Sequence, residues 1–266
     1  MRYLWLLLAF LPALAAGQVD VQKSRFLLLP ASTVERASAG QYQQLLQAAA
    51  QKKALNTDKA QVDRLRAIAR GLIKHSARFN PDAQRWKWEV NLIRSPQVNA
   101  FCMPGGKIAF FSGLIDRLKL DDDEVAVIMG HEMAHALLEH GRARMSREVA
   151  KRLGISIAAL AFNLSDISAS VLGAAADVAV SLPYARGQET DADLAGMEIA
   201  ARAGHDPRAA LRVWQKMAKV ADGGQPPQFL STHPSHASRM RDLEAALPKV
   251  VPLYDAGRIS RGGAKP

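Results

Sequence analysis

Cysteine is nearly absent from this sequence. Cys102 is the one thiol in 266 residues, so the chain has no intrachain disulfide. A metal site in this chain must therefore be built from histidine and carboxylate side chains. We expect Cys102 to be buried, because Phe101-Cys102-Met103 has the composition of a strand interior. No cysteine follows the small residues near the N-terminus, which argues against a lipid-anchored protein.

Long apolar runs are few, and one of them lies at the N-terminus. Residues 1–17 combine a basic start, an apolar stretch and small residues, which is typical of a secretory signal peptide. We predict a signal peptide over residues 1–16, cleaved after Ala15 or Ala16, and hence a periplasmic protein. The alternative is an uncleaved membrane anchor, for which the apolar stretch is short.

A second apolar run covers residues 153–182. It is rich in Ala, Leu, Val and Ile but is interrupted by Asn163, Asp166 and Asp177. Ionisable side chains are costly at membrane depth. We therefore predict two buried helices joined near residues 163–166, with a hairpin that dips into a membrane as the alternative.

Acidic residues are outnumbered by basic ones. The sequence has 35 Lys and Arg against 25 Asp and Glu, which gives a formal net charge of +10. Removal of Arg2 with the signal peptide lowers this charge by one. The excess favours association with an anionic membrane surface or with acidic partners. No nucleic-acid partner is expected, since the basic residues are scattered and no nucleic-acid-binding module is present.

The most informative stretch runs from Asp121 to Gly141 and predicts one amphipathic helix. Its acidic start suits a helix N-terminus, and Gly141 is the expected stop. His131 and His135 lie four residues apart, so both imidazoles share a face and can bind one metal ion. Glu132 lies about 100° further round the helix and can reach a water on that metal. The pattern is typical of zinc proteases, although a surface helix with two solvated histidines would look similar.

A second helix, expected over residues 188–204, carries two carboxylates on one face. Glu189 suits a third metal ligand, and Asp193, four residues later, suits an acceptor for an imidazole N–H. Such an acceptor fixes the tautomer of a metal-binding histidine. The alternative is acidic enrichment at a helix N-terminus, and the neighbouring histidine pair favours the metal site instead.

The fold class predicted from the remaining pattern is α+β and mostly α-helical. The alternation over residues 86–92 predicts a half-buried strand, and extended runs on both sides of Pro104-Gly105-Gly106 predict a hairpin. Together these strands form a small antiparallel sheet directly before the His131 helix. An exposed edge near Asn99 and Ala100 can align a peptide as an added strand, with a purely structural sheet as the alternative.

The chain is expected to have four parts. The signal peptide (1–16) precedes an N-terminal helical region (17–80), which packs on a central domain (81–250). The last part, residues 251–266, is basic and contains glycine, and a disordered tail is expected there.

Several motifs in a fixed order resemble the minigluzincin metalloproteases, which include HtpX-, BepA-, LoiP- and Oma-like members. The matching segments are Asn99-Ala100-Phe101, Pro104-Gly105-Gly106, the His131-Glu132-x-x-His135 helix, Gln188–Asp193, Gly204–Pro207, Ser231–Pro234 and Arg239. The transmembrane helices of HtpX-like members and the acylated cysteine of LoiP-like members are missing. The chain is therefore most similar to the exported, soluble bacterial members.

The resemblance implies a zinc-dependent endopeptidase with a gluzincin-like domain over residues 81–250. It implies one zinc ion per chain on His131, His135 and Glu189, with Glu132 as catalytic base and Asp193 as support for a ligand. His233 is similar to a residue that either closes the metal site as a fourth ligand or contacts the transition state. Arg239 is similar to an orienting or oxyanion-binding residue.

These expectations lead to one main functional hypothesis and two alternatives. The main one is a metalloendopeptidase of the bacterial envelope that degrades misfolded or unassembled proteins. The first alternative is a chaperone-like assembly factor of the outer membrane with a latched zinc site. The second is a structural zinc domain, which Glu132 argues against because a structural site needs no general base.

Overall fold

The structure is a computed structural model that describes residues 18–24, 26–152, 183–222, 227–234 and 237–263. The predicted signal peptide and the predicted pair of helices at 153–182 lie outside the described residues. Among the described helices, none has the length and apolar composition needed to cross a membrane. In chain order the elements are α1 (Ala31–Gln51), α2 (Lys59–Ile73), η1 (Ser76–Arg78), η2 (Pro81–Arg85), β1 (Glu89–Ile93), β2 (Ala100–Met103), β3 (Lys107–Phe111), α3 (Ser112–Leu118), α4 (Asp122–Leu137), α5 (His140–Arg152), α7 (Arg186–Arg202), α8 (Ala209–Asp222), α9 (Gln228–Thr232) and α10 (Ala237–Gly263).

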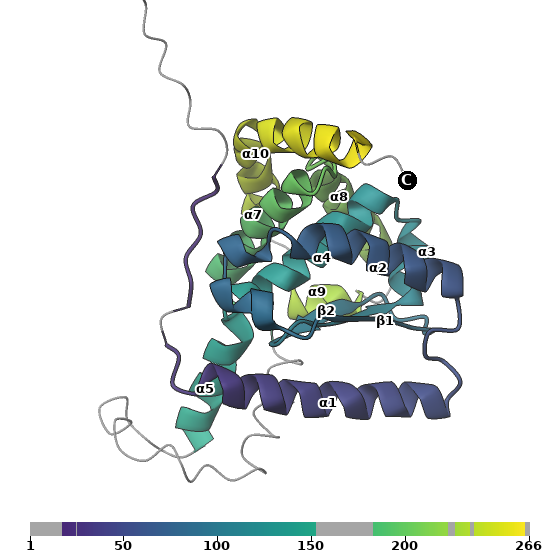
Figure 1. The fold of residues 1–266 in the computed structure, drawn as a ribbon, viewed down its shortest axis with the longest axis vertical. Coiled ribbons are helices and arrows are strands. Elements are labelled where there is room, and N and C mark those ends of the chain that lie inside the picture. The colour runs from purple at the N-terminus through teal and green to yellow at the C-terminus, as the bar shows by residue number, and fades with distance from the viewer. Residues whose placement is uncertain (1–17, 25, 153–182, 223–226, 235–236, 264–266) are drawn as a thin grey trace, which may run out of the picture.

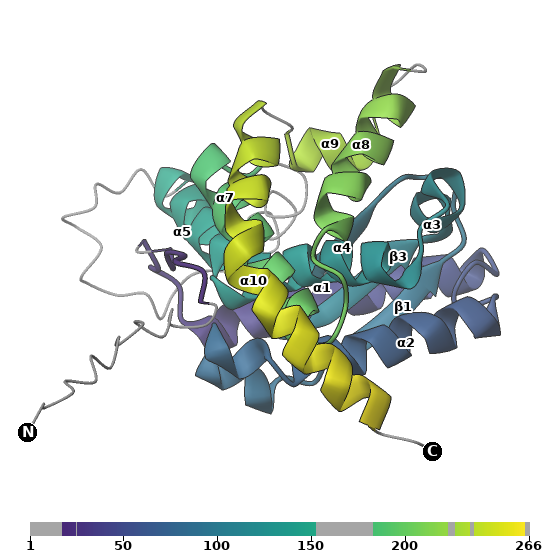
Figure 2. The same ribbon diagram turned by 90° about the horizontal axis from the view of Figure 1, so that it is seen from above.

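The elements form layers around α4. A three-stranded sheet lies between α1 on one face and α2 with α4 on the other (Figure 1). Helices α7 and α8 cover the side of α4 that faces away from the sheet, and α10 lies across both (Figure 2). The predicted class, mostly helical with a small sheet beside the His131 helix, is confirmed. The boundary between residues 17–80 and 81–250 stays a prediction.

The sheet is mixed, with strand order β1-β3-β2. The predicted hairpin is confirmed, because β2 pairs antiparallel with β3 through a turn in which Gly105 and Gly106 take φ values of 82° and 78°. β1 pairs with β3 in parallel, so the expectation of an antiparallel sheet is wrong for this strand. Side-chain alternation shows which face of a strand is buried and carries no information on its direction.

β1 is also more buried than its alternating pattern predicts. A half-buried strand with this alternation would leave Asn91 facing solvent, yet Asn91 is 9% exposed. Its side-chain amide donates to the Tyr42 hydroxyl of α1, and its carbonyl oxygen accepts from the Asn56 side chain. These hydrogen bonds satisfy the polar side chain inside the protein, so the strand does not need a solvated face.

Helix α4 lies at the centre of the core and is not amphipathic as predicted. Its start is as expected: Asp121 caps the helix and forms a capping box with Glu124. Every residue from Glu124 to Leu137 is buried, because α2, the sheet, α7 and α8 together surround the helix. The predicted stop at Gly141 is wrong. The chain turns at Glu139, which has a φ of 60°, and Gly141 lies in the first turn of α5.

Two glycines bring α4 and α7 into backbone contact. A Cβ atom on Gly130 of α4 would lie 2.6 Å from the carbonyl oxygen of Gly196 in α7. A Cβ atom on Gly196 would overlap the backbone nitrogen of His131. The absence of both side chains therefore lets α7 approach the face of α4 that carries His131 and His135.

We predict that Gly196→Ala lowers the free energy of unfolding by about 1–3 kcal/mol, because the added methyl group must push the two helices apart. The same displacement moves Glu189 away from His131, so the affinity for a metal ion held by these two residues should also fall. Urea unfolding and zinc titration measure both effects. Gly187→Ala on the same helix is the control, since a Cβ there meets nothing within 4 Å. Equal behaviour of the two variants would contradict the close contact.

The predicted disordered tail is wrong for most of its length. Helix α10 continues through Pro248 and Pro252 to Gly263, while residues 264–266 lie outside the described part. Val250 is fully buried, and a Cβ on Gly257 would meet the carbonyl oxygens of α7. Packing against α7 therefore orders a segment whose composition alone suggests disorder.

Candidate metal centre

Two helices bring the three predicted metal ligands together. His131 and His135 lie one turn apart on α4, and Glu189 lies in the first turn of α7. The Nε2 atoms of the two histidines are 3.1 Å apart, and Oε1 of Glu189 lies 3.4 Å from Nε2 of His135. All three residues are buried. The fold thus gathers nitrogen and oxygen ligand atoms at one point in the core.

A fourth side chain joins this group from α9. His233 caps the C-terminus of that short helix, and its ring stacks on Phe229 with 4.5 Å between ring centroids. Its Nδ1 atom lies 3.2 Å from Nε2 of His131 and 3.0 Å from Oε1 of Glu189. His233 is therefore placed as a fourth ligand, which the latched interpretation requires.

The geometry of these four residues fits a tetrahedral metal ion. Their ligand atoms all lie within 4.8 Å of one another, and each residue is buried. Zinc ligands at the usual bond lengths in a tetrahedron are about 3.3 Å apart. Three imidazole lone pairs directed at one point repel each other unless a cation lies between them. His131, His135, Glu189 and His233 together can hold one zinc-sized ion.

Asp193 and Arg239 form hydrogen bonds to the ligand side chains of this cluster. Oδ1 of Asp193 accepts a hydrogen bond from Nδ1 of His131 at 2.9 Å, as the sequence predicts for the imidazole acceptor. Arg239 contacts two carboxylates of α7, donating to Glu189 at 2.6 Å and to Asp193 at 2.7 Å. The guanidinium also lies 3.8 Å over the ring of Trp214. Arg239 therefore orients the two carboxylates.

The charges in this region keep both carboxylates ionised. Burial opposes ionisation of Asp193, but the neighbouring Arg239 and His131 together hold its pKa below the usual range. Burial likewise opposes ionisation of Glu189, and His233 with the other groups around it lowers the pKa of that residue. An ionised carboxylate is the form that ligates a metal.

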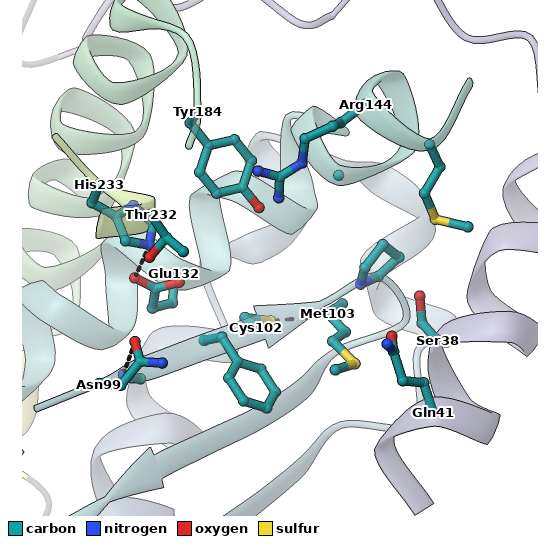
Figure 3. Close-up of a pocket in the computed structure, with 15 residues that line it drawn as sticks. Ser38, Gln41, Asn99, Cys102, Met103, Glu132, Arg144, Tyr184, Thr232 and His233 are labelled. Atoms are coloured by element: carbon teal, nitrogen blue, oxygen red, sulfur yellow. Dashed lines mark hydrogen bonds and ion pairs between the residues drawn. The ribbon is translucent and has the colours of Figure 1, made fainter. Parts of the chain in front are cut away.

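Glu132 faces a cavity beside the cluster. The cavity is lined by Glu132, His233, Asn99 and Ala100 among other residues (Figure 3). Among the described residues Oε1 of Glu132 has no hydrogen-bond partner, and the nearest ring nitrogen of His233 is 3.4 Å away. Burial raises the pKa of Glu132 above its ordinary value. The arrangement suits a proton acceptor next to a metal-bound substrate.

The same cavity contains the edge of β2. Strand order leaves β2 paired with β3 on one side, while Asn99, Ala100 and Cys102 line the cavity. Cys102 is buried, as predicted. Arg239 is not among the residues that line this cavity, and its contacts with Glu189 and Asp193 favour the orienting role over the oxyanion-binding one.

Two residues of this site were not singled out from the sequence. Nδ1 of His140 lies 2.9 Å from Nδ1 of His135, and burial lowers the pKa of His140 to about 3, so the ring stays neutral. His140 can therefore accept the Nδ1 proton of His135, which leaves Nε2 free for a metal. Tyr184 stacks on His135 at a centroid distance of 3.8 Å. For His140, its short spacing from His135 was the available sequence signal. No sequence signal indicated a role for Tyr184.

A buried His/Glu cluster that can hold a metal ion, with the Glu132 carboxylate beside it on α4, defines a metallopeptidase site. The model of peptidase family M48 matches residues 59–247, and the chain belongs to this family. The match confirms the resemblance to minigluzincins.

Comparison with characterised proteins gives the same assignment. The chain is 34% identical over 180 residues to the mitochondrial metalloendopeptidase OMA1 of Arabidopsis thaliana, covering 67% of this chain and 36% of that protein. It is 35% identical over 165 residues to OMA1 of Schizosaccharomyces pombe, covering 61% and 48%. It is 26% identical over 174 residues to the beta-barrel assembly-enhancing protease of Yersinia pestis, covering 61% and 35%. The chain thus spans about a third to a half of the length of these relatives.

Proposed function

We propose that this chain is a zinc-dependent endopeptidase of the bacterial cell envelope that hydrolyses peptide bonds in misfolded or unassembled proteins. The observation that carries this proposal is the position of Glu132, whose Oε1 accepts no hydrogen bond from the described residues and lies beside the metal ligands in a cavity. Relatives named metalloendopeptidase support peptide-bond hydrolysis, and the relative named beta-barrel assembly-enhancing protease supports an envelope role.

The residues of the site divide the chemistry among them. His131, His135 and Glu189 would hold the zinc ion, which would supply a Lewis acid for a water molecule and for the scissile carbonyl. Glu132 accepts the proton of the attacking water and then delivers it to the leaving amine. The raised pKa of Glu132 brings its proton affinity closer to that needed for both transfers.

The edge of β2 can bind a peptide as an added strand. A peptide in extended conformation that pairs with this edge runs along the cavity and passes Glu132. Backbone hydrogen bonds of this kind depend little on side chains. They suit an enzyme that acts on unfolded chains of varied sequence.

The second candidate, a chaperone-like assembly factor with a latched zinc site, is favoured by one observation. Nδ1 of His233 lies at the fourth corner of the ligand group, 3.0–3.2 Å from the neighbouring ligand atoms of Glu189 and His131. A catalytic zinc site keeps one position open for water or substrate. In this arrangement His233 closes that position, and proteolysis requires it to move away.

We predict that His233→Ala increases cleavage of an unfolded protein severalfold while zinc stays bound. Three ligands remain after the substitution, and the open fourth position admits water. Degradation of reduced, unfolded casein by the zinc-loaded protein gives the rate, and metal analysis gives the zinc content. A lower rate at full zinc content would mean that His233 contacts the transition state and does not latch the site.

The proposed location has its own test. Cell fractionation should place the protein in the periplasm, and N-terminal sequencing should begin at Ala16 or Gly17. Extraction from membranes by high salt would support attachment of this basic chain to an anionic membrane surface or to envelope assembly machinery. A chain that begins at Met1 would refute the cleaved signal peptide.

A further inference from the structure

The cavity beside Glu132 has one wall made by side chains that lie outside β2. Figure 3 shows Arg144 of α5 and Tyr184 across the cavity from Cys102 and Met103, with the guanidinium next to the phenol ring. The cavity volume is about 50 Å³. A buried water needs about 10–15 Å³. The cavity therefore has room for a few waters or for one small polar group of a ligand.

Arg144 is held on this wall by a stack of three planar groups. Its guanidinium carbon lies 3.8 Å from the centre of the Tyr184 ring, and that ring stacks on His135 with 3.8 Å between centroids. Tyr184 is fixed in turn by its backbone N–H, which donates to the carbonyl oxygen of Thr232 at 3.1 Å. Arg144 itself is 6% exposed. An arginine that is already fixed in this way loses little conformational freedom when it binds a ligand.

The wall formed by Arg144 and Tyr184 provides positive charge and hydrogen-bond donors. Among the described residues that line the cavity, Arg144 is the one that is always cationic, and Glu132 is the one carboxylate. Burial raises the pKa of Tyr184 to about 12, so its hydroxyl stays protonated and can donate. A guanidinium has five N–H donors, so it can keep its contacts within the protein and still donate to a ligand. Such a wall suits an anionic group that accepts hydrogen bonds.

We infer that Arg144 binds a carboxylate group of the substrate close to the bond that is cleaved. This inference rests on the proposed endopeptidase function and names its substrate class, unfolded chains with an acidic group near that bond. A guanidinium pairs with a carboxylate through two parallel N–H···O bonds, and a group of this size matches the small cavity. The carboxylate comes from a Glu or Asp side chain or from the C-terminus of the substrate. The formal net charge of +10 also attracts acidic chains.

Two peptide series test this inference and distinguish the two sources of the carboxylate. In the first series, quenched fluorescent peptides with amidated ends carry Glu or Gln at each of three positions on either side of one cleaved bond. In the second series, the peptides end one, two or three residues after that bond, with a free or an amidated C-terminus. With the zinc-loaded protein, kcat/KM at one position in one series should be at least about tenfold higher for the carboxylate peptide than for its amide partner.

Substitution of Arg144 tests whether this residue causes the preference. Arg144→Gln should abolish it, so that both members of a pair are cleaved at equal rates. Arg144→Lys keeps the charge but not the planar pair of donors, so it should retain part of the preference. Arg147→Gln is the matched control, because Arg147 is exposed and lies three residues later on α5. If Arg144→Gln lowered cleavage of all peptides equally, or kept the preference because the metal binds the carboxylate, the inference would be overturned.

A binding measurement separates this inference from the proposed activity. Labelled forms of the same peptides are titrated by fluorescence anisotropy against zinc-loaded Glu132→Gln protein, with and without Arg144→Gln. Tighter binding of carboxylate peptides that depends on Arg144, without any cleavage by the native protein, would retain the inference and refute the endopeptidase. Equal binding and equal cleavage of both members of every pair would overturn the inference and leave the endopeptidase in place.

Discussion

Glu132→Gln should lower the rate of casein cleavage by at least about a hundredfold while one zinc ion stays bound per chain. Glutamine keeps the size of the side chain but cannot take a proton from water, and positioned acid–base groups contribute about 10²–10⁴ in rate. The ligands His131, His135 and Glu189 are unchanged, so metal content should be unaffected. Cleavage assays and metal analysis on the same preparation measure both quantities.

Glu244→Gln is the matched control for this variant. Glu244 is exposed on α10, so its substitution should leave the rate unchanged. Full activity of Glu132→Gln would remove Glu132 from the mechanism. Loss of zinc in that variant would instead show that Glu132 is a ligand, in conflict with its position facing the cavity.

Arg239→Met should give the largest loss of stability, lowering the free energy of unfolding of the zinc-free protein by about 3–5 kcal/mol. Arg239 is 2% exposed and is the guanidinium partner of Glu189 and Asp193. Removing one partner of a buried ion pair leaves uncompensated charge in the core, which costs about this much. Zinc affinity should fall as well, since both carboxylates lose the group that orients them.

Urea unfolding and zinc titration test the Arg239 prediction. Arg241→Met is the control, because Arg241 is exposed on the same helix two residues later. A loss of less than about 1 kcal/mol in Arg239→Met would mean that solvent screens the two carboxylates. If Arg239→Met had normal stability but no cleavage activity, the result would indicate that Arg239 binds the oxyanion.

Local features of the fold were predicted well from the sequence. The acidic start expected for the His131 helix is confirmed, because Asp121 caps α4. Gly204 ends α7 with a φ of 77°. Each of these features depends on a few neighbouring residues, so the sequence pattern contains the information needed. The positions of His131 and His135 on one helical face follow from the same local geometry.

Other features depend on contacts between distant segments and could not be predicted. The parallel direction of β1, the burial of α4 on all sides and the ordering of α10 each come from packing partners far away in sequence. The close contact of Gly130 with Gly196 is of the same kind, since a lone glycine in a helix does not reveal what approaches it. The approach of Glu189 to His131 was predicted because a metal site requires a third ligand and because the resemblance to minigluzincins implies it.

One measurement tests the central claim, that His131, His135 and Glu189 converge on one zinc ion. Purified native protein is analysed for metal content and by X-ray absorption at the zinc edge, beside Glu189→Gln. The account predicts one zinc per chain with nitrogen and oxygen ligands at about 2.0–2.1 Å, and much weaker binding in the variant. Native protein that is free of zinc and unaffected by chelators, or that binds zinc equally well as Glu189→Gln, would contradict it.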